Sequence, residues 1–231
     1  MEYDKIARYL DHAVLKPEFT REEAIREIQV GIDYEVRTVC VRPCDIELAN
    51  DMCKGTETEV CCVLGFPHGC ALSESKADEA RRYVNLGVSE IDMVVNYGFV
   101  RSQMWSEVQL DIRAVTSIAK KEGVLVKVIF ETSALGVEEI KKATEIAISA
   151  EADFVKTSTG FASGGATDEA VLAMLEAAQG RIQVKPSGGI RDLARAVTLL
   201  KMGATRLGVG STTTPVICGG AEGGKASEGT Y

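Results

Sequence analysis

Four ionisable side chains interrupt otherwise apolar segments of this sequence. Asp92 stands in EIDMVVN, Lys127 in VKVIFE, Lys156 in DFVKTSTG and Lys185 in VKPSGG. Burial of an unpaired charge is unfavourable, so each of these residues needs a partner or a function. One such lysine alone is explained by a strand end from which the ammonium reaches solvent. Three lysines and an aspartate at equivalent strand positions indicate instead that the four side chains converge.

Converging lysines favour one of two functions. An amine attacks a carbonyl carbon only when it is unprotonated, and an unperturbed lysine, with a pKa of about 10.4, is largely protonated at neutral pH. Burial and a neighbouring ammonium both disfavour the charged form, so two lysines with an aspartate predict Schiff-base chemistry. One lysine would be the nucleophile, the second would lower its pKa, and the aspartate would transfer protons. The alternative is that the lysines neutralise a bound phosphate, and the two functions are compatible.

The elements that must position these residues follow a regular pattern. Short apolar segments bounded by Gly, Pro, Asp or Asn are typical of buried parallel strands. Such segments span 9–15, 36–41, 59–64, 90–96, 125–131, 153–156, 182–185 and 206–209. Helical patterns lie between them, beginning with a capping box at Thr20 and Glu23 and continuing at 73–87, 106–123, 137–150, 167–180 and 191–203.

Eight strand–helix units in 231 residues predict an α/β fold, a single-domain (β/α)8 TIM barrel. An open doubly wound sheet is the second choice, but no GxGxxG follows the first predicted strand to support it. We expect the barrel domain to span 1–217. The remaining residues, 218–231, are Gly-rich, polar and without periodicity, which predicts a flexible C-terminal tail.

Two Gly-rich turns follow the seventh and eighth predicted strands. They contain Gly188 and Gly189 in the first turn, and the stretch 208–211 in the second. Barrels frequently bind phosphate in these loops, through backbone N–H groups and helix N-termini. The sequence therefore predicts a phosphate pocket beside the converging lysines.

Composition excludes several other classes. The chain carries 34 acidic and 26 basic residues, a net charge of −8, which disfavours a broad nucleic-acid surface. No apolar run approaches the roughly 20 residues that cross a bilayer, and the charged start MEYDKIARY is unlike a signal peptide, so we expect no membrane partner. Seven cysteines without a CxxC pair predict mostly core thiols in a reducing compartment, hence a cytoplasmic protein.

The two histidines argue against metal or hydrolase chemistry. His12 and His68 form no HExxH or HxH pair, so no metal and no cofactor is predicted. A Ser-His-Asp hydrolase is disfavoured because the chain has no GxSxG motif. We interpret His12 as a structural or substrate-orienting residue.

Taken together, the motifs resemble those of deoxyribose-phosphate aldolases, a family of class I aldolases. The resemblance extends from Leu10 to about Val209 through LDHAVLKP, VCVRP, VLGFPHG, EIDMVVN, VKVIFET, ADFVKTSTGF and VKPSGGIR. It implies reversible cleavage of 2-deoxy-D-ribose 5-phosphate to D-glyceraldehyde 3-phosphate and acetaldehyde, in deoxyribonucleotide catabolism. It also implies small phosphorylated sugar and aldehyde substrates, and a homodimer or homotetramer.

The resemblance assigns catalytic roles to six positions. Lys156 resembles the Schiff-base lysine and Lys185 the lysine that lowers its pKa. Asp92 resembles the aspartate of the proton relay, supported by Lys127 and Asp11. The terminal Tyr231 resembles a tyrosine that, in some members, enters the site and assists proton transfer.

The same resemblance implies substrate-binding positions. Cys40 resembles a pocket cysteine beside the substrate, and the substrate- and phosphate-binding positions are Thr159, Gly160, Gly188, Gly189 and Ser211. Two residues depart from the family pattern: Phe161 stands where some relatives carry a lysine, and Gly210 where many carry a serine. Both departures predict weaker phosphate contacts.

Three rival functions remain compatible with the sequence. They are a sugar-phosphate isomerase, a transaldolase-like enzyme and a non-catalytic sugar-phosphate sensor. The isomerase needs no imine, and the sensor would bind ligand without releasing acetaldehyde, so both can be separated from an aldolase by experiment.

Overall fold

Parallel strands form one sheet in the computed structural model, which describes residues 5–219. Within that range the strands are β1 (Leu10–Val14), β2 (Thr38–Val41), β3 (Glu59–Leu64), β4 (Glu90–Val94), β5 (Leu125–Ile129), β6 (Phe154–Lys156), β7 (Gln183–Lys185) and β8 (Leu207–Gly210). The order across the sheet is β7-β6-β5-β4-β3-β2-β1-β8, so β8 pairs with β1 although the two are farthest apart in sequence.

Three contacts join β7 to β8 and close the sheet into a barrel. Ser187 and Gly208 form a parallel bridge just beyond the end of β7. The Gly208 amide donates to the Pro186 carbonyl at 2.8 Å, and the Thr205 amide donates to the Val184 carbonyl at 3.2 Å. The predicted (β/α)8 TIM barrel is therefore confirmed.

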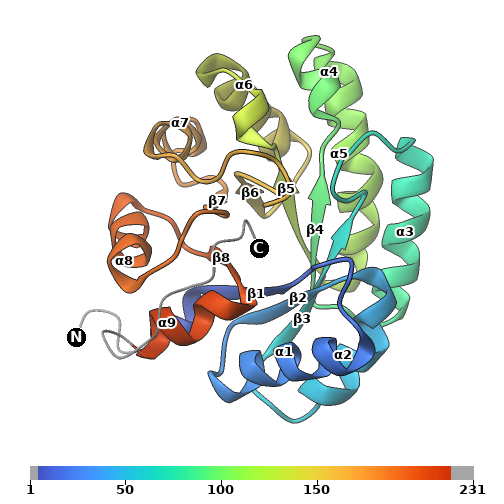
Figure 1. Ribbon diagram of the computed structural model, residues 1–231. Helices are drawn as coiled ribbons and strands as arrows, with labels where there is room; N and C mark the ends of the chain where they lie inside the picture. Colours follow the sequence, from blue (N-terminus) through green and yellow to red (C-terminus); the bar gives the residue numbers. More distant parts are fainter. Residues whose placement is uncertain (1–4, 220–231) are drawn as a thin grey trace.

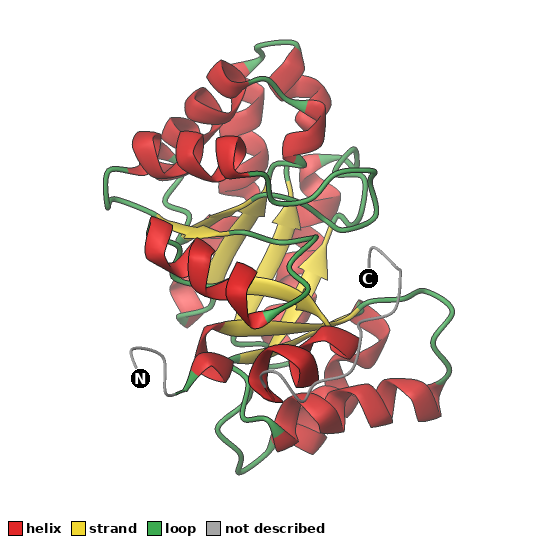
Figure 2. Ribbon diagram, turned by 60° about the vertical axis from the view of Figure 1, so that its left-hand side comes forward, coloured by secondary structure: helices red, strands yellow, loops and turns green. Residues whose placement is uncertain are grey.

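Helices surround the strands on all sides (Figures 1 and 2). In the described range they are α1 (Arg21–Asp33), α2 (Ile46–Cys53), α3 (Ser73–Asn85), α4 (Tyr97–Arg101), α5 (Trp105–Ala119), α6 (Val137–Ser149), α7 (Asp168–Ala178), α8 (Leu193–Met202) and α9 (Thr214–Gly219). Short 3₁₀ turns accompany them: η1 (Ile6–Tyr9), η2 (Pro43–Asp45), η3 (Lys120–Glu122), η4 (Thr132–Ala134) and η5 (Ser211–Thr213). The predicted capping box opens α1, where Thr20 and Glu23 exchange side chain–backbone hydrogen bonds of 2.8 and 3.2 Å.

Alternation of side chains along each strand divides the molecule into two regions. Every second strand residue points outward and packs in one large apolar core between sheet and helices, as Ile91 and Met93 do on β4. The intervening residues point into the barrel. There, a small apolar cluster of Ala13, Leu15, Cys40, Cys61 and Val63 fills the β1–β3 side. Charged side chains occupy much of the remaining interior, together with apolar residues such as Phe154 and Ile129.

The structure differs from the sequence-based prediction mainly at element ends. The predicted strands 90–96 and 125–131 end earlier, at Val94 and Ile129, because the chain turns there; Asn96 instead caps α4 by accepting the Phe99 amide at 3.2 Å. Cys218 and Gly219, placed in the predicted tail, form the end of α9. Residues 220–231 of that tail lie outside the described range.

Candidate active site

Asp92 on β4 is the centre of the charged interior. Its Oδ2 accepts hydrogen bonds from Lys156 Nζ at 2.8 Å and Lys185 Nζ at 2.6 Å. Its Oδ1 accepts from Lys127 Nζ at 2.7 Å. Because the Lys156 and Lys185 ammonium nitrogens share one acceptor oxygen, they lie within a few ångströms of each other. The structure thus brings together the four charged residues singled out from the sequence.

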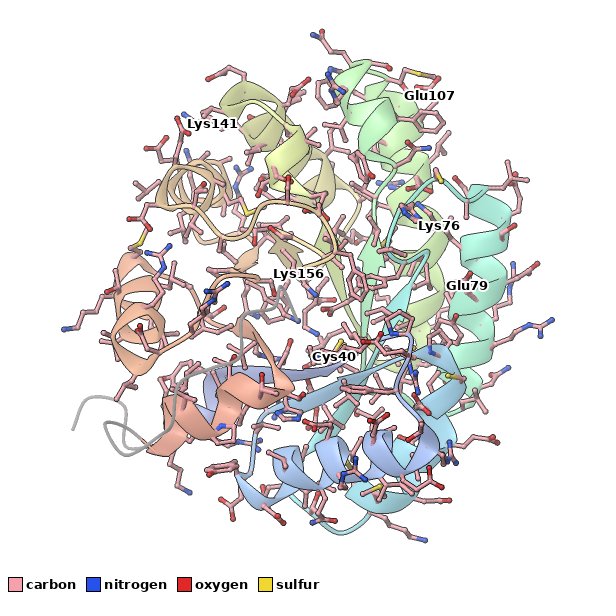
Figure 3. The ribbon with its side chains drawn as sticks, in the orientation of Figure 1. Cys40, Lys76, Glu79, Glu107, Lys141 and Lys156 are labelled. Carbon is pink, nitrogen blue, oxygen red and sulfur yellow. The ribbon has the colours of Figure 1, made fainter. Side chains whose placement is uncertain are left out.

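Strand register explains this convergence. Asp92 and Lys127 are paired positions on β4 and β5, and Lys156 and Lys185 are paired positions on β6 and β7. Paired residues of neighbouring strands project to the same face of the sheet, here the barrel interior. Lys156 is the last residue of β6, at the carboxyl end where TIM-barrel enzymes place their catalytic residues. In Figure 3, Lys156 and Cys40 lie toward the centre of the barrel, whereas Glu107 and Lys141 lie on its outer helices.

A second group of charges lies closer to the amino ends of the strands. Asp11 on β1 contacts Lys185 through Oδ2, and the same oxygen lies 3.3 Å from Lys127 Nζ. Glu90 is 2.5 Å from Lys127 Nζ, and Arg206 binds both Glu90, at 2.8 and 3.0 Å, and Asp11, at 2.6 Å. The side chains of this group are almost fully buried.

Opposite charges dominate the electrostatics of these groups. Burial alone would raise the carboxyl pKa of Asp92, but the ammonium groups of Lys127, Lys156 and Lys185 outweigh it and hold the pKa well below its usual range. The pKa values of Asp11 and Glu90 are lowered in the same way, against burial, by Lys127 and Arg206. The pKa of Lys127 is raised well above normal because its carboxylate neighbours outweigh its own desolvation. These groups are therefore charged at neutral pH.

The charges of this network do not cancel. It contains four cationic side chains, Lys127, Lys156, Lys185 and Arg206, and three carboxylates, Asp11, Glu90 and Asp92. With every group ionised, the buried network carries one excess positive charge. Loss of a single proton from one lysine would make the network neutral, and it would leave that lysine with the unprotonated amine that nucleophilic attack requires.

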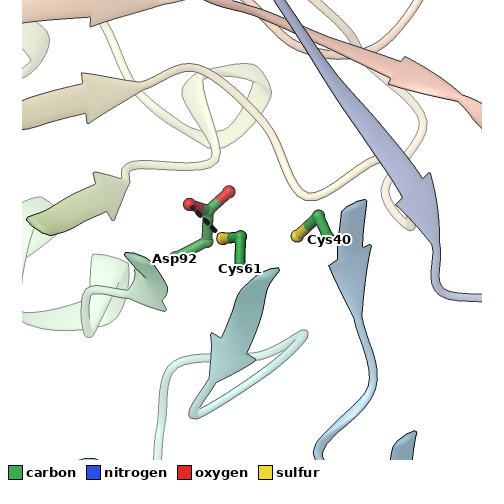
Figure 4. Close-up of side chains that lie close together, drawn as sticks. All are labelled: Cys40, Cys61 and Asp92. Atoms are coloured by element: carbon green, nitrogen blue, oxygen red, sulfur yellow. Dashed lines mark hydrogen bonds between the residues drawn. The ribbon is translucent and has the colours of Figure 1, made fainter. Parts of the chain in front are cut away.

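Two thiols adjoin the network on its β2–β3 side (Figure 4). Cys61 Sγ donates to Asp92 Oδ1 at 3.3 Å, and Cys40 occupies the paired position on β2. A hydrogen bond from Cys61, together with the nearby charges of Lys185 and Lys156, lowers the pKa of Cys40, while burial raises that of Cys61. Ligand atoms of Cys40, Cys61 and Asp92 lie within 4.8 Å of one another, but both Asp92 oxygens already bind ammonium groups, which repel a further cation. The thiols therefore do not make a favourable metal site.

The predicted substrate-binding glycines lie in loops at the carboxyl ends of β6 and β7. Gly160, Gly188 and Gly189 all have positive φ, at 86°, 84° and 76°. A Cβ at Gly189 would meet nothing within 4 Å, so its backbone borders open space. Gly188 packs against Gly165, and its carbonyl accepts the Ala166 amide at 3.0 Å. The loops after β6 and β7 therefore form one continuous rim.

The other predicted binding positions are arranged on the same rim. Ser211 begins η5 immediately after β8 and is buried. The Thr159 hydroxyl donates to Glu131 Oε2 and accepts the Phe161 amide at 3.1 Å, so it shapes the loop and has no proton left to donate to a phosphate. Phe161, found in place of a lysine, packs edge-on against Phe66, with ring centroids 5.2 Å apart.

Sequence reasoning missed three members of the site. Glu90 and Arg206 belong to the charged network, and Glu131 holds the loop after Lys156 through the Thr159 amide at 3.2 Å. Glu90 precedes Asp92 by two positions on the same strand, so strand periodicity could have placed both on one face. Glu131 adopts a left-handed backbone conformation, φ 56° and ψ 63°, which no sequence signal indicated.

Two further predicted residues do not join the described site. His12 points away from the barrel interior: its ring nitrogens lie 2.8 Å from Thr214 Oγ1 and 2.8 Å from the Glu27 carbonyl oxygen, so its role is structural. Tyr231 lies outside the described residues, and its predicted role stays a prediction. Four of the seven cysteines are buried, as expected of core thiols, while Cys44 and Cys70 are exposed.

Comparisons with known proteins show which family and fold the chain shares with them. A model of the DeoC/LacD family of aldolases matches residues 8–213. A deoxyribose-phosphate aldolase of Clostridium perfringens is 41% identical over the full length of both chains. Among solved structures, an aldolase called QR15 is 39% identical, with a TM-score of 0.87 over 93% of this chain and 94% of its own. The tetrameric deoxyribose-phosphate aldolase of Aeropyrum pernix is 27% identical, with a TM-score of 0.84 over 93% and 89% of the two chains.

One further property concerns membranes. In residues 5–219, no helix has the length and apolar character that crossing a membrane requires.

Proposed function

This chain belongs to the DeoC/LacD family of aldolases, and from that membership we propose that its reaction proceeds through an imine on Lys156. It is a carbon–carbon lyase that cleaves 2-deoxy-D-ribose 5-phosphate reversibly to D-glyceraldehyde 3-phosphate and acetaldehyde. The observation that carries the imine mechanism is the shared contact of Lys156 and Lys185 with one oxygen of Asp92.

The reaction begins with neutral Lys156. Its Nζ attacks C1 of the open-chain sugar, and loss of water from the resulting carbinolamine leaves a protonated imine. The C3 hydroxyl then loses its proton as the C2–C3 bond breaks, and the bonding electrons enter the imine to give an enamine. Glyceraldehyde 3-phosphate departs. Protonation of the enamine at C2 and hydrolysis of the new imine release acetaldehyde and restore the lysine.

Asp92 is suited to transfer these protons. It contacts Lys156 directly and, through its other oxygen, Lys127, whose ammonium is held by Asp11 and Glu90. Lys185 is bound between Asp92 and Asp11, which hold its ammonium beside Lys156. A fixed positive charge at that place favours the neutral, nucleophilic form of the neighbouring amine.

The rim of the barrel is the proposed phosphate site. The Gly188–Gly189 turn and Ser211 follow β7 and β8, where backbone amides and helix N-termini commonly bind phosphate in this fold. Gly160 completes the rim beside Lys156, Thr159 shapes the loop through its bonds to Glu131 and Phe161, and Cys40 borders the reacting end of the substrate. Phe161 and Gly210 replace polar side chains, which favours weaker phosphate binding.

The remaining proposals concern the cellular setting. We place the reaction in deoxyribonucleotide catabolism, in the cytoplasm, because all seven cysteines are free. We also expect a homodimer or homotetramer, as the Aeropyrum pernix relative is tetrameric. Sedimentation of the purified chain measures that state directly.

Borohydride trapping tests the mechanism. Incubation with acetaldehyde followed by reduction should attach one ethyl group to Lys156, located by peptide mass mapping, and should abolish activity irreversibly. The Lys156→Ala variant should show neither the label nor turnover, whereas the exposed Lys142→Ala variant should behave as the parent. A stable adduct on another residue, or no adduct while deoxyribose 5-phosphate is still cleaved, would contradict the assignment. An isomerase or a binding protein would release no acetaldehyde in the coupled assay.

A further inference from the structure

A bidentate ion pair lies beneath the catalytic lysines and takes no part in the steps described above. Arg206 Nη1 and Nη2 lie 2.8 and 3.0 Å from the two carboxylate oxygens of Glu90. Glu90 is inaccessible to solvent and Arg206 is 6% exposed. The guanidinium also stacks over the Phe154 ring, 5.2 Å from its centroid, so its position is fixed by packing as well as by charge.

Glu90 and Arg206 each contact a different residue that leads to Asp92, and we call these two sets of contacts the branches of the network. Glu90 Oε2 is 2.5 Å from Lys127 Nζ, and Lys127 in turn contacts Asp92. Arg206 Nη1 is 2.6 Å from Asp11 Oδ1, and Asp11 in turn contacts Lys185. The two branches meet again at Asp92, which binds both Lys127 and Lys185. The pair therefore closes a ring of buried charges, and the nucleophile Lys156 is joined to that ring through Asp92.

Few other charges face this ring. Arg37 Nε approaches Glu90 Oε1 only to 4.0 Å, and its Nη2 is paired with Glu59 at 3.0 Å near the barrel's amino end. The Asp153 carboxylate accepts the Val126 amide at 2.8 Å, and Glu131 accepts from Thr159. On the β2–β3 side the facing groups are the thiols of Cys40 and Cys61. The hydrogen bonds of Asp153 and Glu131 therefore go to groups outside the ring.

We propose that Glu90 and Arg206 are positioning residues that set the pH at which Lys156 becomes nucleophilic. They do so by fixing the net charge of the ring and Lys156 together at one positive unit when all lysines are protonated. The proposal rests on the imine mechanism, because it concerns the proton that Lys156 must lose before it attacks. Neither residue touches the reacting atoms.

The rate of imine formation falls on the acidic side of its pH profile because Lys156 becomes protonated, and we call this part of the profile the acid limb. Substitutions that remove opposite charges should shift the acid limb in opposite directions. Arg206→Met removes the excess charge, so Lys156 keeps its proton to higher pH and the limb moves upward. Glu90 stays ionised in this variant through its contact with Lys127. Glu90→Gln raises the excess to two units, so Lys156 loses its proton more readily and the limb moves downward. For charges roughly 10 Å apart at an effective dielectric constant of about 20, each shift is about one pH unit.

The double variant provides the decisive comparison. Glu90→Gln combined with Arg206→Met removes one charge of each sign, so the net charge of the ring is that of the parent. The acid limb should return to within about a third of a pH unit of its original position, even if the rate itself is lower. A purely structural role would make both single variants slower without moving the limb in opposite directions.

The experiment measures the rate of imine formation with saturating acetaldehyde, quenched with borohydride at successive times across mildly acidic to mildly alkaline pH. Circular dichroism at each pH confirms that the variants are folded. Arg81→Met and Glu151→Gln serve as matched controls because they remove the same charges from exposed pairs outside the barrel, and they should leave the limb in place.

The outcomes separate this inference from the proposed function. If Lys156 is not labelled in the parent protein, the imine mechanism itself fails. If Lys156 is labelled but the single variants shift the limb in the same direction, or not at all, only the role of Glu90 and Arg206 is overturned. Failure of the double variant to restore the limb overturns it as well. If both single variants are unfolded, the double variant remains a test, because a limb displaced from that of the parent overturns the role.

Discussion

Lys156 and Lys185 share an acceptor oxygen, but their other contacts give them different tasks. Lys185 is bound by two carboxylates, those of Asp11 and Asp92, and is inaccessible to solvent. Lys156 ends its strand at the carboxyl edge of the barrel, beside the loops that border open space. This difference in contacts supports the proposal that Lys156 is the nucleophile, although the two residues are paired positions on neighbouring strands.

Asp92→Asn should separate imine formation from turnover. The amide keeps the shape of the side chain but loses the charge and the ability to accept a proton. We expect kcat for deoxyribose 5-phosphate cleavage to fall by about 10²–10⁴-fold, the usual contribution of general acid–base catalysis. Borohydride should still trap acetaldehyde on Lys156, because that lysine is unchanged. Steady-state kinetics and peptide mass mapping measure the two effects, and equal loss of both would contradict a proton-transfer role.

At the scale of single residues, the sequence predicts those site residues that carry a charge within an otherwise apolar segment. Lys127, Lys156 and Lys185 stand within apolar strands, so their burial requires an explanation that only a shared site provides. Glu90 and Arg206 are each the first residue of a predicted strand, where exposure to solvent is the ordinary outcome. Their burial depends on each other across the barrel, which no local pattern reveals.

At the scale of elements, strand periodicity does most of the positioning. Alternate residues on β4 face the outer core, and the residues between them, Glu90 and Asp92, face the barrel interior. A shift of the strand by one residue would therefore turn the charged side chains toward the outer core and the apolar ones into the interior.

The predicted strands match the observed ones in number and order, because apolar runs and bounding turns are local signals. The short helices α2 and α4 were not predicted, since eight and five residues carry too little periodicity. Pairing of β8 with β1, in contrast, joins segments far apart in the sequence, which no local signal indicates.

His12 ties three elements together and predicts an acid-sensitive contribution to stability. It lies on β1 and contacts the Glu27 carbonyl of α1 and Thr214 of α9. Burial, opposed by the hydrogen bond to Glu27, lowers its pKa from 6.5 to about 4. The neutral ring is favoured in the folded state, so its contribution is complete above pH 6.5 and is lost as the pH falls toward 4. Over that pH interval, titration of His12 should change the free energy of unfolding by about 3 kcal/mol.

Urea unfolding at a series of pH values tests this contribution. The free energy of unfolding of the parent should fall more steeply between pH 6.5 and 4 than that of His12→Gln, which cannot titrate there. His68→Gln is the matched control, because His68 is exposed in the loop after β3 and should not alter the slope. Parallel curves for the parent and His12→Gln would show that His12 is not the titrating group.

At the scale of the whole molecule, the barrel makes burial of so many charges possible. Eight strands bring seven ionised side chains into one interior, where each carboxylate has at least two cationic partners. The sequence predicts this architecture because eight βα units of this length have one common closed arrangement. It does not predict the net charge of the interior, which depends on residues from β1, β4 and the segment before β8 meeting at one point. The acidic surface, with 34 acidic residues in the chain, is independent of that arrangement.

The buried network also determines how the molecule responds to strong acid. In the folded state the pKa values of Asp11, Glu90 and Asp92 are lowered, because cationic neighbours outweigh burial. Carboxyl groups with lowered folded pKa values stabilise the protein above their unfolded pKa values, near pH 4, and this stability is lost as the pH falls further. Unfolding then takes up three protons at these sites, so the free energy of unfolding should decrease by about 4 kcal/mol per pH unit below pH 4, in addition to the contribution of exposed groups.

The slope can be assigned to the network by comparison with a variant that carries one carboxylate fewer. The double variant Glu90→Gln with Arg206→Met binds two such protons on unfolding, so its slope should be smaller by about 1.4 kcal/mol per pH unit. Denaturant unfolding at several pH values between neutrality and the acid transition measures both slopes. The ring makes three carboxylates dependent on one another, so acid unfolding should be a single cooperative transition, at a pH below the range in which protonation of Lys156 already slows imine formation. If the parent and the double variant showed equal slopes, the carboxyl groups that take up protons on unfolding would lie outside this network.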